Sequence, residues 1–310
     1  MNSLRLVKKQ WILLLFLVPA LVHVLLFNYL PMFGIVIAFQ DFDILKGFAH
    51  SDFVGFANFV AFFEDHEFWQ ALKNTVGINV ICLILVFPLP IVLAIALDEM
   101  MGTRFKKVVQ SISYLPHFIS WVVVGGLFYR MLDANSGIVN ILLMKLGHSP
   151  IPFFREPHFF WAIIVFATIW KEIGWNSILY LAALNAIDSS LYEAAKVDGA
   201  NRFQRIRHIS LPGISTTVIL LFILTVSTII CGNGGVNGTM TPNLDAYLNM
   251  RNPLVASSSD VIDVINYYKG VLGSEYSYAT AIGLFQSVFS LFVLFTVNFA
   301  AKKWRGASVI

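Results

Sequence analysis

The sequence predicts an all-α integral membrane protein with six transmembrane helices, and three features of the chain support this fold class. First, 57% of its 310 residues are hydrophobic and only 13% are charged, whereas a soluble domain holds about 25% charged residues. Second, six segments stay apolar over roughly the 20 residues that a helix needs to cross a bilayer. Third, the basic residues gather in alternate connections between these segments.

The six apolar segments cover, in order, residues 11–39, 71–97, 108–132, 159–187, 213–231 and 278–301. The first follows two lysines as a signal peptide would, but it is far longer than the roughly 7–15 apolar residues of a signal. We therefore expect it to remain as a helix. Pro88 and Pro90 predict a kink in the second segment, because a proline inside a helix removes a backbone hydrogen bond. We expect two parts: residues 1–70, with the first helix and an outer loop, and residues 71–310, with a five-helix core.

The distribution of Lys and Arg predicts the orientation of the chain. Thirteen of the 21 basic residues lie in four short segments on one side: Arg5, Lys8, Lys9, Arg104, Lys106, Lys107, Lys196, Arg202, Arg205, Arg207, Lys302, Lys303 and Arg305. Cytoplasmic segments carry such an excess of positive charge, so we expect both termini in the cytoplasm. The opposite loops are longer, and we expect the last one, residues 232–277, to be flexible and exposed.

A polar stretch between the fourth and fifth segments, SSLYEAAKVDGANRFQRIRHISLPG at residues 189–213, predicts a short helical hairpin. Ser190 and Glu193 have the spacing of a capping box, which predicts a helix from about residue 191 to 197. Gly199 suits a reversal because glycine tolerates positive φ. A second helical stretch, residues 201–208, carries basic and apolar side chains on different faces. From these residues alone, the hairpin could lie on anionic lipid headgroups or dock a cytoplasmic protein.

The hairpin resembles the EAA motif of permease subunits in binding-protein-dependent ABC importers. It fills every fixed position of the pattern E-A-A-x3-G-x9-I-x-L-P, from Glu193 to Pro212. The resemblance implies a type I ABC importer permease fold, in which residues 189–212 form a coupling helix that docks on a cytoplasmic ATPase. The residues expected to make this contact are Glu193, Ala194, Ala195, Asp198 and Gly199.

The rest of the chain resembles the branch of that family that imports oligosaccharides and polysaccharide fragments. The similar stretches include YLPMFGIVIAFQDFD at residues 29–43 and SDVIDVINYYKGV at residues 259–271, whereas GNGGVNGTMTPN at 232–243 departs from the pattern. The chain contains no Walker A sequence, so ATP and Mg²⁺ would be bound by a partner and no cofactor by this chain. The resemblance implies two cytoplasmic ATPase subunits, a second permease in a heterodimer, and an extracytoplasmic solute-binding protein that docks on the outer loops. It also implies the bacterial inner membrane, and no nucleic-acid partner.

The fourth segment carries polar residues at membrane depth, where they are costly and usually face a cavity or a partner. Glu172, Asn176 and Tyr180 are spaced i, i+4 and i+8 and share one helix face, with Trp175 beside them. This stripe predicts sugar contacts along the substrate path. The alternative is helix packing, with Lys171 and Glu172 neutralising partners in another chain. His117, in the third segment, is expected to be a packing residue rather than a metal ligand.

Two other classes of protein compete with the importer hypothesis. An ion-coupled secondary transporter of a small polar solute would need an acidic relay within the membrane and usually an internal repeat, and the chain shows Glu172 and no visible repeat. An intramembrane enzyme would need a nucleophile–base pair or a metal cluster, and neither stands out at membrane depth. We therefore expect a transport subunit with no catalytic and no metal-binding residues.

Overall fold

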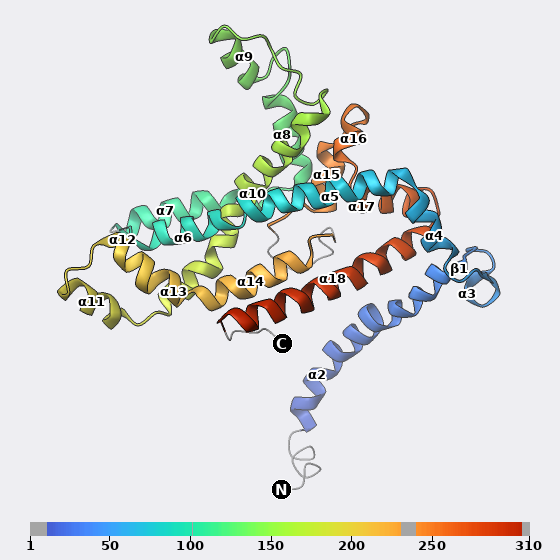
Figure 1. The fold of residues 1–310 in the computed structure, drawn as a ribbon, viewed down its shortest axis with the longest axis horizontal. Helices are drawn as coiled ribbons and strands as arrows, with labels where there is room; N and C mark the ends of the chain where they lie inside the picture. Colours follow the sequence, from blue (N-terminus) through green and yellow to red (C-terminus); the bar gives the residue numbers. More distant parts are fainter. Residues whose placement is uncertain (1–10, 101, 231–239, 306–310) are drawn as a thin grey trace. The chain divides into compact units, whose positions relative to one another are not determined.

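The computed structural model describes residues 11–100, 102–230 and 240–305, and helices make up most of them (Figure 1). The chain divides into two compact units. The first comprises Met1–Asp65 and Asn266–Phe285, and the second comprises His66–Ile265 and Gln286–Ile310. The last helix, α18 (Tyr276–Arg305), contributes to both units.

The first unit contains the N-terminal helix and a small region of short helices and strands. Its elements are α2 (Trp11–Val24), η1 (Leu25–Tyr29), η2 (Leu30–Phe39), β1 (Gln40–Asp41), α3 (Gly47–His50), β2 (Asp52–Phe53), α4 (Ala57–Glu64) and η6 (Asn266–Leu272). The two short strands pair antiparallel, with Gln40 opposite Phe53. The carboxylate of Asp65 accepts hydrogen bonds from Lys269 at 2.5 Å and from the Tyr278 hydroxyl at 2.6 Å. These charged contacts connect the end of α4 to η6 and to the start of α18.

The second unit holds the remaining helices, with α10 at its centre. Its elements are α5 (His66–Leu85), α6 (Pro88–Asp98), α7 (Thr103–Tyr114), η3 (Leu115–Phe118), α8 (Trp121–Met131), α9 (Ile138–Lys145), α10 (Pro157–Asn185), α11 (Ser189–Val197), α12 (Arg202–Arg205), η4 (Ile206–Ser210), α13 (Leu211–Gly213), α14 (Ser215–Ser227), α15 (Leu244–Met250), η5 (Pro253–Val255), α16 (Ala256–Ser259) and α17 (Ile262–Ile265). Helices α5, α6, α7, α14, α15 and α16 all contact α10. Apolar side chains of α10 such as Phe160 and Ile164 are fully buried in the resulting core.

Among the described residues, four helices are long and apolar enough to cross a membrane: Leu15–Phe39, His66–Asp98, Pro157–Asn185 and Tyr276–Lys303. Two further segments are bent pairs, Thr103–Phe118 with Trp121–Met131 at 99° and Arg202–Gly213 with Ser215–Ser227 at 59°. This part of the chain thus has four membrane helices, or up to six if each bent pair is one span. Pro88 and Pro90 predict a kink in the second span, and the helix is interrupted just before them, at Val86 and Phe87. Both prolines lie in the first turn of α6, where a missing N–H costs little.

The third predicted span, residues 108–132, is not one continuous helix. The helix stops at Phe118, the backbone is extended at Ile119 and Ser120, and a new helix starts at Trp121 in a different direction (Figure 1). Pro116 lies just before the break, and a proline has no N–H for a helical hydrogen bond. Ser120 then caps the new helix by accepting a hydrogen bond from Val123 N–H at 3.5 Å.

The prediction of a flexible, exposed last outer loop is wrong for residues 240–265, which pack into the second unit. Met250 and Val255 are fully buried there. Side chains of distant spans hold the backbone of this segment: Trp161 donates to Ser258 O at 2.9 Å, and Asn74 donates to Asp260 O at 2.8 Å. The first part of the predicted loop, residues 232–239, lies outside the described residues.

Candidate functional site

The hairpin is built from α11 and α12 with Gly199 at the bend, as predicted. Gly199 has φ +79°, a conformation that other residues adopt at a cost. Two hydrogen bonds close the end of α11: Ala200 N–H donates to Ala195 O at 2.8 Å, and Gly199 N–H donates to Lys196 O at 3.1 Å. This pair of bonds is the Schellman motif, which satisfies the last carbonyls of a helix and reverses the chain.

The predicted capping box of Ser190 and Glu193 is wrong. The residue that caps α11 is Asp188, whose carboxylate accepts a hydrogen bond from Ser190 N–H at 2.9 Å. Because Asp188 is itself a strong capping residue, the helix starts earlier than expected, and Glu193 falls in its second turn. The Ser190 backbone N–H and hydroxyl lower the pKa of Asp188 below its ordinary value. A true capping box occurs instead at the start of α12, between Asn201 and Gln204.

One face of α11 is open. Glu193, Ala194 and Val197 lie at i, i+1 and i+4 on this face, and the side chain of Val197 is 89% exposed. Asp198 and Gly199, which follow the helix, are exposed as well, whereas Ala195 is partly buried. Sequence analysis missed Val197, although its spacing of four residues from Glu193 could have indicated it.

The opposite face of the hairpin is held to the rest of the second unit. The Tyr192 hydroxyl hydrogen-bonds to the buried Ser210 hydroxyl at 2.9 Å. The Glu99 carboxylate, at the end of α6, lies 3.7 Å from Arg205 Nη2 and 4.0 Å from Arg202 Nε. Partly exposed ion pairs of this kind contribute about 0–1 kcal/mol each. An open pocket of about 850 Å³ lies beside these contacts and is lined by residues of the hairpin and of the ends of α6 and α10.

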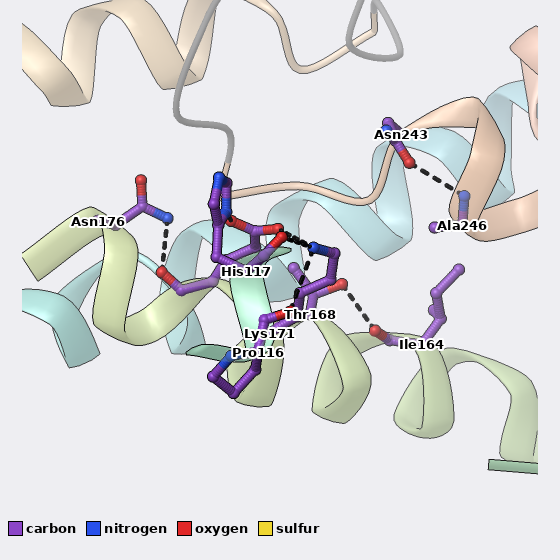
Figure 2. Close-up of polar contacts among 9 residues, drawn as sticks. Pro116, His117, Ile164, Thr168, Lys171, Asn176, Asn243 and Ala246 are labelled. Carbon is purple, nitrogen blue, oxygen red and sulfur yellow. Dashed lines mark hydrogen bonds and ion pairs between the residues drawn. The ribbon is translucent and has the colours of Figure 1, made fainter. Parts of the chain in front are cut away.

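The polar residues in the middle of α10 meet the break between η3 and α8 (Figure 2). Glu172 Oε2 lies 2.7 Å from His117 Nδ1, and Glu172 Oε1 lies 3.5 Å from Lys171 Nζ. The Lys171 ammonium also donates to the backbone carbonyls of His117 and Pro116. Within this chain, both Lys171 and Glu172 thus have charged or polar partners.

The other residues of the predicted substrate path, Trp175, Asn176 and Tyr180, differ in their exposure and in their contacts. Trp175 stacks on the His117 ring, with the centroids 4.2 Å apart, and keeps part of its surface exposed. The Asn176 amide is buried and donates to Glu172 O at 3.0 Å within its own helix. Tyr180 is fully buried, and its hydroxyl has no hydrogen-bond partner among the described residues. The structure thus brings Glu172 and Trp175 together around His117, which has the contacts expected of a packing residue.

Comparisons with known proteins agree on one family. Residues 86–305 match the family described as "Binding-protein-dependent transport system inner membrane component". The chain is 40% identical over 297 residues to "Protein LplB" of Bacillus subtilis (strain 168), an alignment that covers 96% of this chain and 90% of that protein. It is 37% identical over 301 residues to "Polygalacturonan/rhamnogalacturonan transport system permease protein YteP" of the same organism, covering 97% and 90% of the two chains.

Two solved structures are similar over nearly the whole chain. One is a chain of a bacterial ABC transporter involved in the import of the acidic polysaccharide alginate, with a TM-score of 0.86, 34% identity, and coverage of 97% of this chain and 98% of that one. The other is from the bacterial alginate ABC transporter in complex with an alginate pentasaccharide-bound periplasmic protein. It has a TM-score of 0.87, 34% identity, and coverage of 100% of both chains.

Proposed function

This chain belongs to the binding-protein-dependent transport system inner membrane component family, and on that premise we propose how it works as a permease subunit of an ABC oligosaccharide importer. It is a multi-pass protein of the inner membrane. Its substrates are oligosaccharides or polysaccharide fragments delivered by an extracytoplasmic solute-binding protein. The name of the related YteP and the complex of the alginate transporter with its periplasmic protein support this substrate class and this partner.

The observation that carries the coupling step is the open face of the α11 hairpin. Glu193, Ala194 and Val197 present a small, partly apolar surface at a rigid bend, and the EAA motif occupies the same segment. In this proposal residues 189–212 are the coupling helix, and Glu193, Ala194, Ala195, Asp198 and Gly199 dock on a cytoplasmic ATPase. Closure of two ATPase subunits on ATP would then move the hairpin and, through α10, the membrane helices.

The chain needs partners to work in this way. It contains no Walker A sequence, so ATP and Mg²⁺ bind to the ATPase subunits. The family to which the chain belongs implies a second permease subunit, and we propose a heterodimer. Both termini lie in the cytoplasm, in agreement with the distribution of basic residues.

We further propose that Trp175 contacts the sugar on the substrate path. Its indole is partly exposed, and a flat apolar ring suits the C–H edges of a pyranose. Glu172, Asn176 and Tyr180 are buried in this conformation and would support the path from behind. An alanine in place of Trp175 is expected to lower uptake without releasing the ATPase subunits.

The experiment that tests the proposed function is uptake into proteoliposomes. The chain is purified together with the subunits that co-assemble with it, reconstituted, and supplied with its solute-binding protein and a panel of neutral and acidic oligosaccharides. Uptake is expected to require ATP inside the vesicles and to be insensitive to dissipation of the proton gradient. Uptake that needs the gradient and not ATP would establish the ion-coupled transporter instead.

A further inference from the structure

The break in the third membrane segment leaves backbone groups that need partners. The axes of Thr103–Phe118 and Trp121–Met131 differ by 99°, and the two residues between them are extended. The last carbonyls of a helix have no partner within it. In a bilayer each unsatisfied backbone group costs several kcal/mol, so a break is tolerated only where the protein supplies hydrogen bonds.

Lys171 supplies one for the carbonyl of His117. It lies at the midpoint of the 29-residue helix α10, about 21 Å from either end, and its side chain is 6% exposed. Its ammonium donates to the carbonyl of His117 and lies 3.5 Å from the carbonyl of Pro116, which also accepts a hydrogen bond from Ile119 N–H at 3.1 Å (Figure 2). The same nitrogen lies 5.6 Å from the centroid of the Trp121 ring, the first residue of α8. One side chain therefore contacts both sides of the break.

Glu172 and His117 keep this ammonium in place. A buried cation without a counter-charge is costly, and the Glu172 carboxylate, 3.5 Å from Lys171 Nζ, balances it. The second carboxylate oxygen binds the His117 ring at 2.7 Å, which ties the side chain of His117 to the same helix that holds its carbonyl. The cluster joins two adjacent residues of α10 to His117, just before the break.

A close helix contact fixes α7 beside this cluster. A Cβ atom on Gly174 would lie 1.9 Å from Ser113 O, so the two backbones meet where only glycine fits. Gly174 is one turn beyond Lys171 on α10, and Ser113 is one turn before His117. The position of η3 against α10 is therefore set at two neighbouring points, and the direction of α8 follows from the cap at the break.

We propose that Lys171 is a positioning residue of the transport cycle: its ammonium holds the carbonyls of Pro116 and His117, keeps the third segment broken, and so sets the direction of α8. The transport part of this inference rests on the proposed function, whereas the shape of the third segment can be measured independently of it. A merely electrostatic role is the competing explanation, in which Lys171 neutralises Glu172 and does nothing for the backbone.

Substitutions separate the two roles in the reconstituted complex. We expect Lys171→Met to lower the turnover of uptake at least about tenfold, with the KM for the sugar-loaded binding protein within about twofold, because that protein docks on the outer face. The double variant Lys171→Met/Glu172→Gln, in which both charges are gone, is expected to stay as defective, and Lys171→Arg, which can still donate to both carbonyls, to retain uptake. Recovery of normal uptake in the double variant would overturn the proposal.

A matched control lies one turn away on α10. Thr168 is fully buried, and its hydroxyl donates to Ile164 O at 2.8 Å within its own helix (Figure 2). Thr168→Val removes one buried hydrogen bond from α10 without touching the break, and uptake is expected to stay within about twofold of the unmodified complex. A loss in Thr168→Val equal to that in Lys171→Met would show general damage to α10 and contradict a role specific to the break.

The shape of the third segment is read by spin labels on cysteines that replace the exposed residues Val108 and Met131, in the complex without Cys82 and Cys231. In a continuous helix these positions would be about 35 Å apart, and the bend of 99° between the two helices shortens the distance. Lys171→Met is expected to shift or broaden the distance distribution toward the longer value. An unchanged distribution would refute the proposal, even in a complex whose uptake proved not to depend on ATP.

Discussion

The bend at Gly199 offers a quantitative test of the proposed ATPase contact. Gly199 has φ +79°, and among the described residues nothing lies within 4 Å of the position that a Cβ atom would take. Substitution therefore meets no steric clash, and its whole cost arises from the backbone. For alanine in this left-handed conformation the cost is about 1–2 kcal/mol. A β-branched residue is a clear outlier there, so Gly199→Val should cost more, whereas Gly199→Asn should cost less.

The expected effect on docking follows from this cost. The hairpin can relieve the strain by giving up the hydrogen bonds of Gly199 N–H to Lys196 O and of Ala200 N–H to Ala195 O. Docking would then have to restore the bend, so the affinity of the permease for the ATPase falls by up to the strain energy. For alanine, about 1–2 kcal/mol corresponds to a loss of roughly 5–30-fold. Titration of the purified permease with ATPase, followed by ATP-driven uptake, measures this loss.

Gly147 is the matched control. It follows α9 with φ +84°, and a Cβ atom added to it would again have no described atom within 4 Å. Its hydrogen bonds are the same in kind: Gly147 N–H donates to Met144 O and His148 N–H to Leu143 O, both at 3.0 Å. Gly147→Ala and Gly147→Val should thus lower stability as much as the Gly199 variants and leave ATPase affinity unchanged. If the Gly147 and Gly199 variants bound the ATPase with equal affinity, or if Gly199→Val supported normal uptake, the coupling role of the bend would be refuted.

Two further outcomes follow from local contacts. Because the pKa of Asp188 is lowered, its cap on α11 is complete above the ordinary value of 3.8 and is lost as the pH falls through the lowered value. The protection of α11 amides from hydrogen exchange should therefore be constant down to about pH 4 and decrease below it. In Asp188→Asn, this pH dependence of the protection should disappear. Gly174→Ala should separate α7 from α10 and destabilise the complex by about 1–3 kcal/mol. Gly126→Ala should not destabilise it, because the space around Gly126 is open among the described residues. Equal melting temperatures of the two variants in detergent would contradict this expectation.

The sequence by itself determined the class of protein and the place of the helical hairpin that bends at Gly199. Apolar length and the distribution of basic residues are properties of the chain alone, so they predicted membrane helices near their observed positions. The bend at Gly199 was predictable for the same reason, since positive φ is a preference of one residue. The first residue of α11 was not predicted correctly, because Asp188 and Ser190 are both good capping residues and lie only two positions apart. Their spacing does not show which of them caps the helix.

Only the tertiary structure decided the break at Ile119 and Ser120 and the packing of residues 240–265. An apolar run with one proline reads as a continuous helix, because the donor that satisfies the broken backbone, Lys171, lies more than 50 positions along the chain. Likewise, Trp161 and Asn74, which lie on other helices, hold the backbone of residues 240–265. Backbone that leaves a helix at membrane depth is stable only with hydrogen bonds from elsewhere in the fold, and composition and periodicity describe each segment without those partners.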